Sequence, residues 1–171
     1  GQDPRRSTQQ RARLGLLSHQ TLLYDDLTAA ENLTFFAGLY GLGADAVDAA
    51  LADVDLHDHA DARVGGFSRG MKQRLALARA TLHAPEVLLL DEPFTGLDRP
   101  SARALSARLQ QRTASTCVSS VLVTHNVEAA AGLVNRIVVL RGGRIVCDEP
   151  WTAGDGPRLQ ALCDHHQEGQ S

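Results

Sequence analysis

Hydrophobic and polar positions along the chain follow the spacing of alternating strands and helices. Short apolar runs have the length of buried strands: residues 13–17, 87–90 and 119–124. Apolar positions that recur at helical spacing, or lie between helix start and stop signals, predict helices: residues 32–40, 45–54, 68–82, 100–112 and a segment from Val127. Strands that alternate with helices predict an α/β protein with a mostly parallel sheet.

Polar residues mark the ends of several of these elements. Thr28 is followed three residues later by Glu31, which is the spacing of a capping box at a helix start. Ser68 is placed to open the helix over residues 68–82. Gly142 and Gly143 separate two short apolar runs, as in a β-hairpin. The concentration of helices between Thr28 and Leu82 interrupts the alternation and predicts a helical subdomain beside the sheet.

Composition narrows the class of protein. The chain has 171 residues, 43% of them hydrophobic and 22% charged, as in an ordinary globular domain. Its net charge of −3 argues against a nucleic-acid partner. No apolar run approaches the roughly 18 residues of a membrane span. The three cysteines, Cys117, Cys147 and Cys163, are scattered, which favours free thiols over a disulfide framework.

Two adjacent carboxylates, Asp91 and Glu92, follow the apolar run of residues 87–90. At the end of a buried strand, one carboxylate can hold Mg²⁺ and the other can orient or deprotonate a water molecule. The alternative is a strand that ends in solvated acids. Pro93 and the Gly96, Leu97, Asp98 sequence that follows favour the functional interpretation.

Ser68 and Gly70 stand at the predicted start of a helix, where free N–H groups attract anions. From this segment alone, an ordinary capped helix is the better interpretation. His125 after the run of residues 119–124 could donate a hydrogen bond to a phosphate, although a lone loop histidine is more often incidental. Gln20 after the first strand could reach a metal ion, but alone it says little.

In this order, the segments resemble those of the ATP-binding subunit of ABC transporters, across about residues 11–148. Gln20 fits the Q-loop, residues 67–71 the signature motif, and residues 87–92 the Walker B strand. Residues 95–98 fit the D-loop, and His125 fits the switch histidine. The resemblance implies a P-loop-NTPase-like ABC ATPase domain, with a mostly parallel sheet core and a helical subdomain.

The resemblance also implies one role for each matching residue. Glu92 is expected as the catalytic base, with His125 contacting the γ-phosphate of ATP. Mg²⁺ is expected at Asp91 and Gln20. A head-to-tail dimer with a second ATP-binding subunit is expected, in which Ser68 and Gly70 touch the ATP held by the other subunit. Gln20, Arg69 and Asp98 are the other residues expected to bind the nucleotide.

The sequence departs from the family pattern in two respects. Arg69 stands where the signature prefers glycine, and Met71 where it prefers glutamine; Arg69 keeps a positive charge near the partner's phosphate. No G-x-x-x-x-G-K-[ST] loop is present, and the one lysine, Lys72, cannot form it. We therefore expect one partial domain that lacks its N-terminal strands and P-loop, and an isolated chain that is inactive as an ATPase. Its expected parts are residues 11–27, 28–83, 84–148 and a tail over 149–171.

Residues 15–20 and 23–33 resemble the ATP-binding subunit of the haem exporter used in cytochrome c maturation. This implies ATP-driven export at the cytoplasmic face of the cell membrane, through transmembrane permease subunits. The alternatives are the ATPase of another exporter of the multidrug or ABC-2 type, and a degenerate, non-catalytic partner subunit. An ABC ATPase of DNA repair or translation fits less well, because no second ATPase domain or long coiled coil appears.

Overall fold

The computed structural model describes residues 8–115, 118–125, 130 and 132–152. The chain forms two compact units, residues 1–123 and 124–171, which are described separately. Several features predicted from sequence lie outside the described residues: most of the helix from Val127, Cys117, Cys163 and the tail beyond Thr152.

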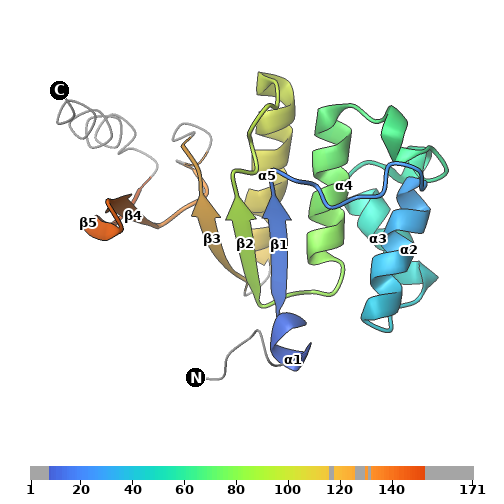
Figure 1. Cartoon of the computed structure of the whole chain (residues 1–171), viewed down its shortest axis with the longest axis horizontal. Coiled ribbons are helices and arrows are strands. Elements are labelled where there is room, and N and C mark those ends of the chain that lie inside the picture. The colour runs from blue at the N-terminus through green and yellow to red at the C-terminus, as the bar shows by residue number, and fades with distance from the viewer. Residues whose placement is uncertain (1–7, 116–117, 126–129, 131, 153–171) are drawn as a thin grey trace. The chain divides into compact units, whose positions relative to one another are not determined.

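The first unit is built on a parallel sheet of three strands in the order β1-β2-β3 (Figure 1). The strands are β1 (Leu14–Ser18), β2 (Val87–Asp91) and β3 (Ser119–Val123). Leu16 pairs with Leu89, and Leu89 with Val121, so the carboxyl ends of all three strands meet at one edge of the sheet. The α/β fold predicted from the alternation of strands and helices is confirmed.

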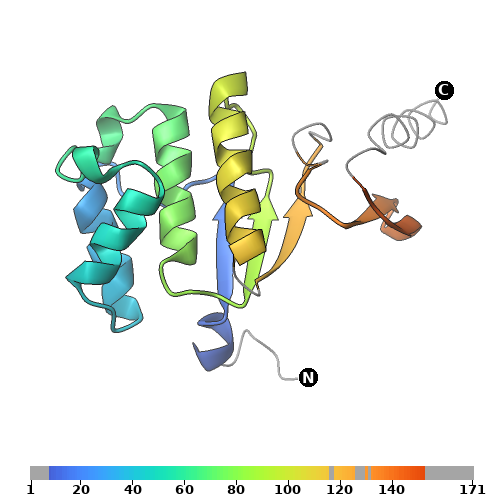
Figure 2. The same cartoon turned by 180° about the vertical axis from the view of Figure 1, so that it is seen from behind.

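Helices lie on one face of this sheet and beyond the β1 edge (Figure 2). The helices of this unit are α1 (Thr8–Arg11), α2 (Ala29–Leu39), α3 (Ala44–Asp53), α4 (Arg69–Thr81) and α5 (Arg99–Ser115), with short 3₁₀ turns η1 (His57–His59) and η2 (Val64–Gly66). Helix α5 lies across the rear face of the sheet, and α4 runs beside β1 (Figures 1 and 2). The predicted capping box of α2 is present, with Thr28 and Glu31 in reciprocal hydrogen bonds.

Helix α4 is buried on two sides because it stands between the sheet and the helices α2 and α3 (Figure 1). Leu75 and Ala78 belong to the hydrophobic core that α4 shares with α2 and α3. We call the pair of helices α2 and α3 the helical layer. Toward the sheet, Arg79 donates to the carbonyl of Leu16 at 2.7 Å, and the carbonyl of Ala80 lies against Gly15. The predicted apolar stripe of residues 71, 75, 78 and 82 is therefore only one of its two buried sides.

One prediction of burial is wrong, and another holds only in part. β3 forms within residues 119–124, but Val121 is 53% exposed and Val123 58%. Among the described strands β3 pairs with β2 alone, and α5 covers the other face of the sheet. On α2, the apolar spacing predicted from Leu33, Phe36, Leu39 and Tyr40 faces the core only in part: Leu33 is buried, but Leu39 is 67% exposed and Tyr40 38%. Small residues bring α2 close to its neighbours instead, and its buried side chains are Ala29, Asn32, Leu33 and Ala37.

The second unit contains the predicted hairpin. β4 (Arg136–Arg141) and β5 (Arg144–Pro150) pair antiparallel. Gly142 and Gly143 form the turn with φ of 54° and 76°, a conformation that glycine adopts without steric cost. Across the described part of the chain, no helix is both long and apolar enough to span a bilayer.

Candidate functional site

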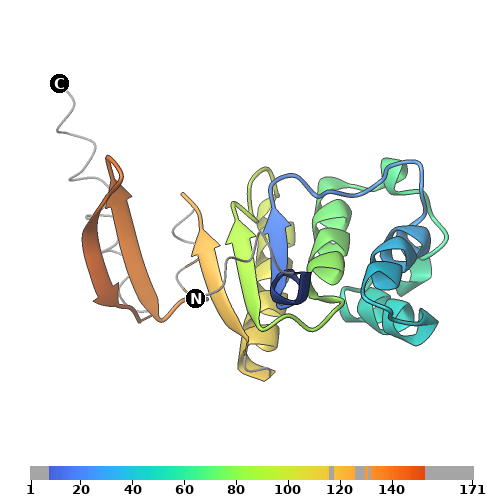
Figure 3. The ribbon, with the colours of Figure 1, turned by 60° about the horizontal axis from the view of Figure 1, so that its bottom comes forward.

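Several residues singled out from the sequence lie at the carboxyl edge of the parallel sheet in the first unit. Ser18, Asp91 and Val123 are aligned in register at the ends of β1, β2 and β3 (Figure 3). Gln20 lies in the loop that follows β1, and Glu92 directly follows β2. His125 follows β3 in the sequence but belongs to the second unit, which is described separately. Ligands of α/β proteins bind at this edge of the sheet.

Glu92 has an unusual backbone. Its φ of 48° lies in the left-handed region, which is rare for a residue with a side chain and costs free energy. Hydrogen bonds hold it in place: its N–H donates to the carbonyl of Val123 at 2.8 Å, and the hydroxyl of Thr95 donates to its Oε2 at 3.3 Å. Such strained residues are found where the surrounding structure fixes a functional group.

The first turn of α4 forms a second polar surface in the same unit. Ser68 is the N-cap, and its Oγ accepts a hydrogen bond from the N–H of Met71 at 3.2 Å. A Cβ on Gly70 would lie 2.7 Å from Oγ of Ser101, so glycine is needed where α4 approaches α5. The predicted helix start is confirmed, and its free N–H groups suit an anion.

Arg69 contacts the loop that carries Glu92. Its Nε donates to the carbonyl of Thr95 at 3.0 Å. Its guanidinium packs against Gly96, where an added Cβ would lie 2.6 Å from Cζ. Gly96 has a φ of 72°, so this position favours glycine on two grounds.

Gln73 is a site residue that the sequence reasoning missed. It is buried, and its Nε2 donates to the carbonyl of Pro93 at 2.9 Å. The signal available in the sequence was a glutamine at i+4 from Arg69, two residues before the apolar position Leu75. With Arg69 it gives α4 two attachments to the loop after β2.

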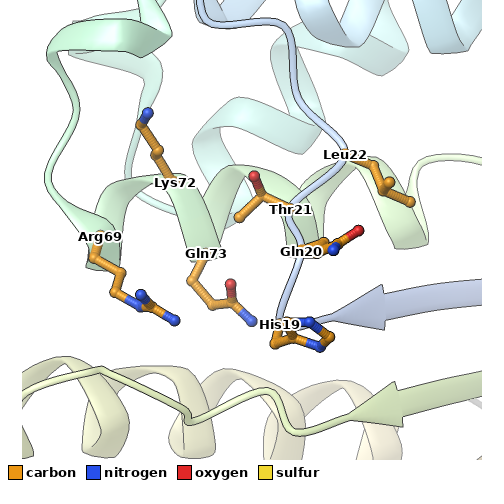
Figure 4. Close-up of a pocket in the computed structure, with 7 residues that line it drawn as sticks. All are labelled: His19, Gln20, Thr21, Leu22, Arg69, Lys72 and Gln73. Carbon is orange, nitrogen blue, oxygen red and sulfur yellow. The ribbon is translucent and has the colours of Figure 1, made fainter.

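A hollow of about 460 Å³ separates the loop after β1 from the first turn of α4. Its lining is polar and cationic, without a carboxylate: His19, Gln20, Thr21, Leu22, Arg69, Lys72 and Gln73. Figure 4 shows Arg69 and Gln73 extending from one side of α4 and Lys72 from the other. Lys72 pairs with Asp25 at 2.8 Å, away from Gln73.

Asp98 begins α5. Its Oδ1 accepts a hydrogen bond from the N–H of Ser101 at 2.9 Å, as an N-cap residue does. Hydrogen bonds from the side chain and the backbone of Ser101 lower the pKa of the Asp98 carboxyl. The carboxylate is thereby kept ionised, and in this unit its contacts are those of a helix cap.

The described residues fit a magnesium ion that is carried by a phosphate ligand, and do not fit a protein-held metal. No group of three or more His, Cys, Asp or Glu side chains gathers into a metal site within the described part of the chain. Mg²⁺ bound with phosphates takes only one or two protein ligands and keeps several waters. The exposed carboxylate of Asp91 meets that smaller demand.

A second polar cluster lies at the free edge of β1. His83 Nε2 is 3.0 Å from the carbonyl of Leu14, and its ring stacks on Tyr40 at 4.1 Å. Burial lowers the pKa of His83, and the nearby positive charge of Arg79 lowers it further, against the raising effect of the Leu14 carbonyl. Burial also lowers the pKa of Arg79.

The lowered pKa of His83 predicts a loss of stability in mild acid. Because the unfolded chain binds a proton at His83 near the usual pKa of 6.5, the contribution to stability is complete above that pH and falls as the pH drops toward the folded pKa. In urea unfolding, the free energy of unfolding of the parent chain should fall more steeply between pH 7.5 and 5.5 than that of His83→Gln. His57→Gln, at an exposed histidine, is the control and should show the same dependence of the free energy of unfolding on pH as the parent chain. An equal pH dependence in the parent, His83→Gln and His57→Gln would contradict the prediction.

Comparisons with known proteins place these observations among characterised relatives. The profile of a family described as "ABC transporter" matches residues 1–95. The ABC transporter ATP-binding protein NatA of Bacillus subtilis (strain 168) is 38% identical over 141 residues, which cover 78% of this chain and 56% of NatA. The Nod factor export ATP-binding protein I of Burkholderia pseudomallei (strain K96243) is 40% identical over 149 residues, covering 85% of this chain and 49% of the relative.

The chain thus spans about half the length of the curated relatives that it matches. Among solved structures, cbiO1 of Clostridium perfringens, part of the ABC transporter complex cbiONQ, superposes with a TM-score of 0.77. The match covers 95% of this chain and 66% of cbiO1 at 20% identity, a level that speaks to the fold alone.

Proposed function

Because the chain belongs to the ABC transporter family of ATP-binding proteins, we propose that it is the catalytic part of a transport ATPase. The observation that carries the proposal is the placement of Asp91 and Glu92 at the carboxyl end of β2, with Glu92 held by Thr95 and Val123. The reaction is the hydrolysis of ATP to ADP and phosphate. In the domain we assign residues 11–27, 28–83 and 84–148 to the Q-loop region, the helical subdomain and the Walker B core.

Glu92 is the general base in this proposal. Its carboxylate takes a proton from the attacking water, while the Thr95 hydroxyl holds one of its oxygens. Asp91 and Gln20 face the magnesium ion, and His125 the γ-phosphate. Mg²⁺, when bound with ATP, neutralises the charge that develops on the phosphates. The local arrangement at Glu92 supports this assignment, and the others rest on the family pattern.

A second ATP-binding subunit completes the site. The Ser68 cap, Gly70 and the first-turn N–H groups of α4 form an exposed anion-binding surface in the same unit as Glu92. In a head-to-tail dimer this surface, with Arg69 and Asp98, faces the ATP that is held by the partner subunit. A dimer of two copies of this protein and a dimer of this protein with a related subunit use the same surface.

We place the protein at the cytoplasmic face of a membrane through a permease. An aromatic surface at the loop after β1 supports this proposal, since Tyr24 and Phe35 are 49% and 47% exposed. Tyr24 and Phe35 pack edge to face with centroids 5.4 Å apart. Exposed aromatic clusters of this kind mark protein contacts.

Export is the proposed direction of transport. One relative is named for Nod factor export, which supports an exporter. Haem export for cytochrome c biogenesis rests on the wording of residues 15–20 and 23–33 alone, and remains a second, narrower hypothesis for the substrate. Loss of cytochrome c maturation on deletion of the gene would favour haem, and normal maturation would favour another exported substrate.

The test of the function is ATP hydrolysis by the 171-residue chain and by the complete product of its gene. The chain itself carries no G-x-x-x-x-G-K-[ST] loop, so most contacts to the β- and γ-phosphates are absent and we expect background turnover. The complete product, if an upstream segment supplies that loop, should hydrolyse ATP in the presence of Mg²⁺.

A non-catalytic partner subunit is the competing function. It predicts a complete gene product that has no lysine loop and is inactive alone, yet raises turnover when mixed with a complete ATP-binding subunit. Robust Mg²⁺-dependent hydrolysis by the 171-residue chain would contradict the expected inactivity of the isolated chain.

A further inference from the structure

We infer that Arg69 is a positioning residue for Glu92, acting through Thr95 from the first turn of α4. The inference rests on the proposed function of Glu92 as the general base. It departs from the expectation that the charge of Arg69 serves a partner's phosphate, because its Nε is committed to the same chain: the carbonyl of Thr95 accepts its hydrogen bond at 3.0 Å.

The connection from Arg69 to Glu92 is short. Thr95 receives the Arg69 hydrogen bond at its carbonyl, and its hydroxyl donates to Oε2 of Glu92 at 3.3 Å. The N–H of Thr95 also donates to the carbonyl of Glu92 at 3.2 Å. A shift of Thr95 therefore moves both the donor that orients the carboxylate and the turn that carries it.

The loop needs such support because Glu92 sits in the left-handed region at φ 48°. A strained backbone persists only where neighbouring contacts hold it, and relaxation would turn the carboxylate away. Val123 holds the start of the loop through the N–H of Glu92, and Gln73 holds Pro93 from α4. Arg69 holds the far end, where its guanidinium packs against Gly96.

This arrangement ties two functional surfaces of the chain together. The N–H groups of the first turn of α4 and the carboxylate of Glu92 cannot move independently while Arg69 and Gln73 bind the loop. A glycine at position 69 would leave Gln73 as the single side-chain hydrogen bond from α4 to this loop among those described. Arg69 thus acts on the geometry of the base, and its removal should affect turnover more than ATP binding.

The experiment uses the complete gene product with its partner subunits and measures kcat and KM for ATP. Arg69→Gln and Thr95→Val should each lower kcat by about tenfold with KM within about twofold, because misplacing a catalytic group costs rate more than binding. The double variant should lose no more than the stronger single variant, since the two hydrogen bonds act in series on the Glu92 carboxylate through Thr95. Thr95→Ser, which keeps the hydroxyl, should restore kcat.

Arg103→Gln is the matched control, because it removes the same charge from an exposed site on α5. Hydrogen exchange of residues 92–98 gives a readout that does not depend on activity: it should quicken in Arg69→Gln and remain unchanged in Arg103→Gln. If Arg69→Gln does not fold, the Thr95→Val and Thr95→Ser pair still decides whether the hydroxyl orients Glu92.

Three outcomes would overturn the inference. Unchanged kcat in Arg69→Gln and Thr95→Val would show that the contact is not used. A raised KM with unchanged kcat in Arg69→Gln would assign Arg69 to phosphate binding, and multiplied losses in the double variant would make the two residues independent. Glu92→Gln separates these from failure of the proposed function: if it abolishes hydrolysis, Glu92 remains the base, and if it does not, the function itself is wrong.

Discussion

Glu92→Gln in the complete gene product should lower kcat for ATP hydrolysis by about 10²–10⁴-fold, the range that a general base contributes. Glutamine keeps the size of the side chain and an oxygen that can accept the hydrogen bond from Thr95. It cannot take a proton from water at neutral pH. The loop should therefore keep its shape, and the loss should fall on the chemical step.

Glu86→Gln is the matched control for this prediction. Glu86 precedes β2 at the end of the sheet opposite Glu92, and its carboxylate pairs with Arg13. The same chemical change there should leave kcat within about twofold, because an exposed ion pair contributes little. Steady-state kinetics on both variants checks the result. An active Glu92→Gln variant would remove the base from the proposed mechanism.

Gly15→Ala should lower the free energy of unfolding by about 3 kcal/mol, at the upper end of the cost of overpacking a core. A Cβ at this position would lie 2.3 Å from the backbone carbonyl of Ala80 and 2.9 Å from atoms of Leu88 and Pro85. The nearest atom belongs to the backbone of α4, so no side-chain rotation relieves the contact. β1 and α4 must separate to admit one methyl group.

Gly38→Ala is the control for Gly15→Ala. Gly38 lies on the exposed side of α2, where an added Cβ meets nothing within 4 Å. Alanine there should raise stability by about 0.5–1 kcal/mol, because glycine disfavours a helix. Urea unfolding followed by circular dichroism measures both variants. Equal stability of Gly15→Ala and the parent chain would mean that β1 and α4 are not in tight contact.

Local patterns in the sequence predicted most of the fold. The capping box of Thr28 and Glu31, the Ser68 cap and the glycine pair of the hairpin are each encoded within a few residues, so each could be found without the structure. The two carboxylates after β2 were found for the same reason. An apolar run followed by acids is a contiguous signal.

Features that depend on contacts between distant segments were not predicted. The bond from Gln73 to Pro93 joins residues 20 positions apart, and that from Arg69 to Thr95 joins residues 26 apart. No periodicity in the sequence records such pairs. The exposure of Val121 likewise depends on which elements cover β3. An apolar run shows that a strand forms but does not show whether both of its faces are covered.

Because α4 is buried on two sides, the first unit cannot be cut into separate folding pieces at α4. A cut that removed the helical layer together with α4 would strip β1 of the Arg79 and His83 bonds to its carbonyls. A cut that left α4 behind would expose Leu75 and Ala78, which complete the core of α2 and α3. Neither piece carries a closed core of its own. The helical layer is therefore no portable module: recombination between relatives can exchange α2 and α3 only if the face of α4 that receives them is exchanged as well.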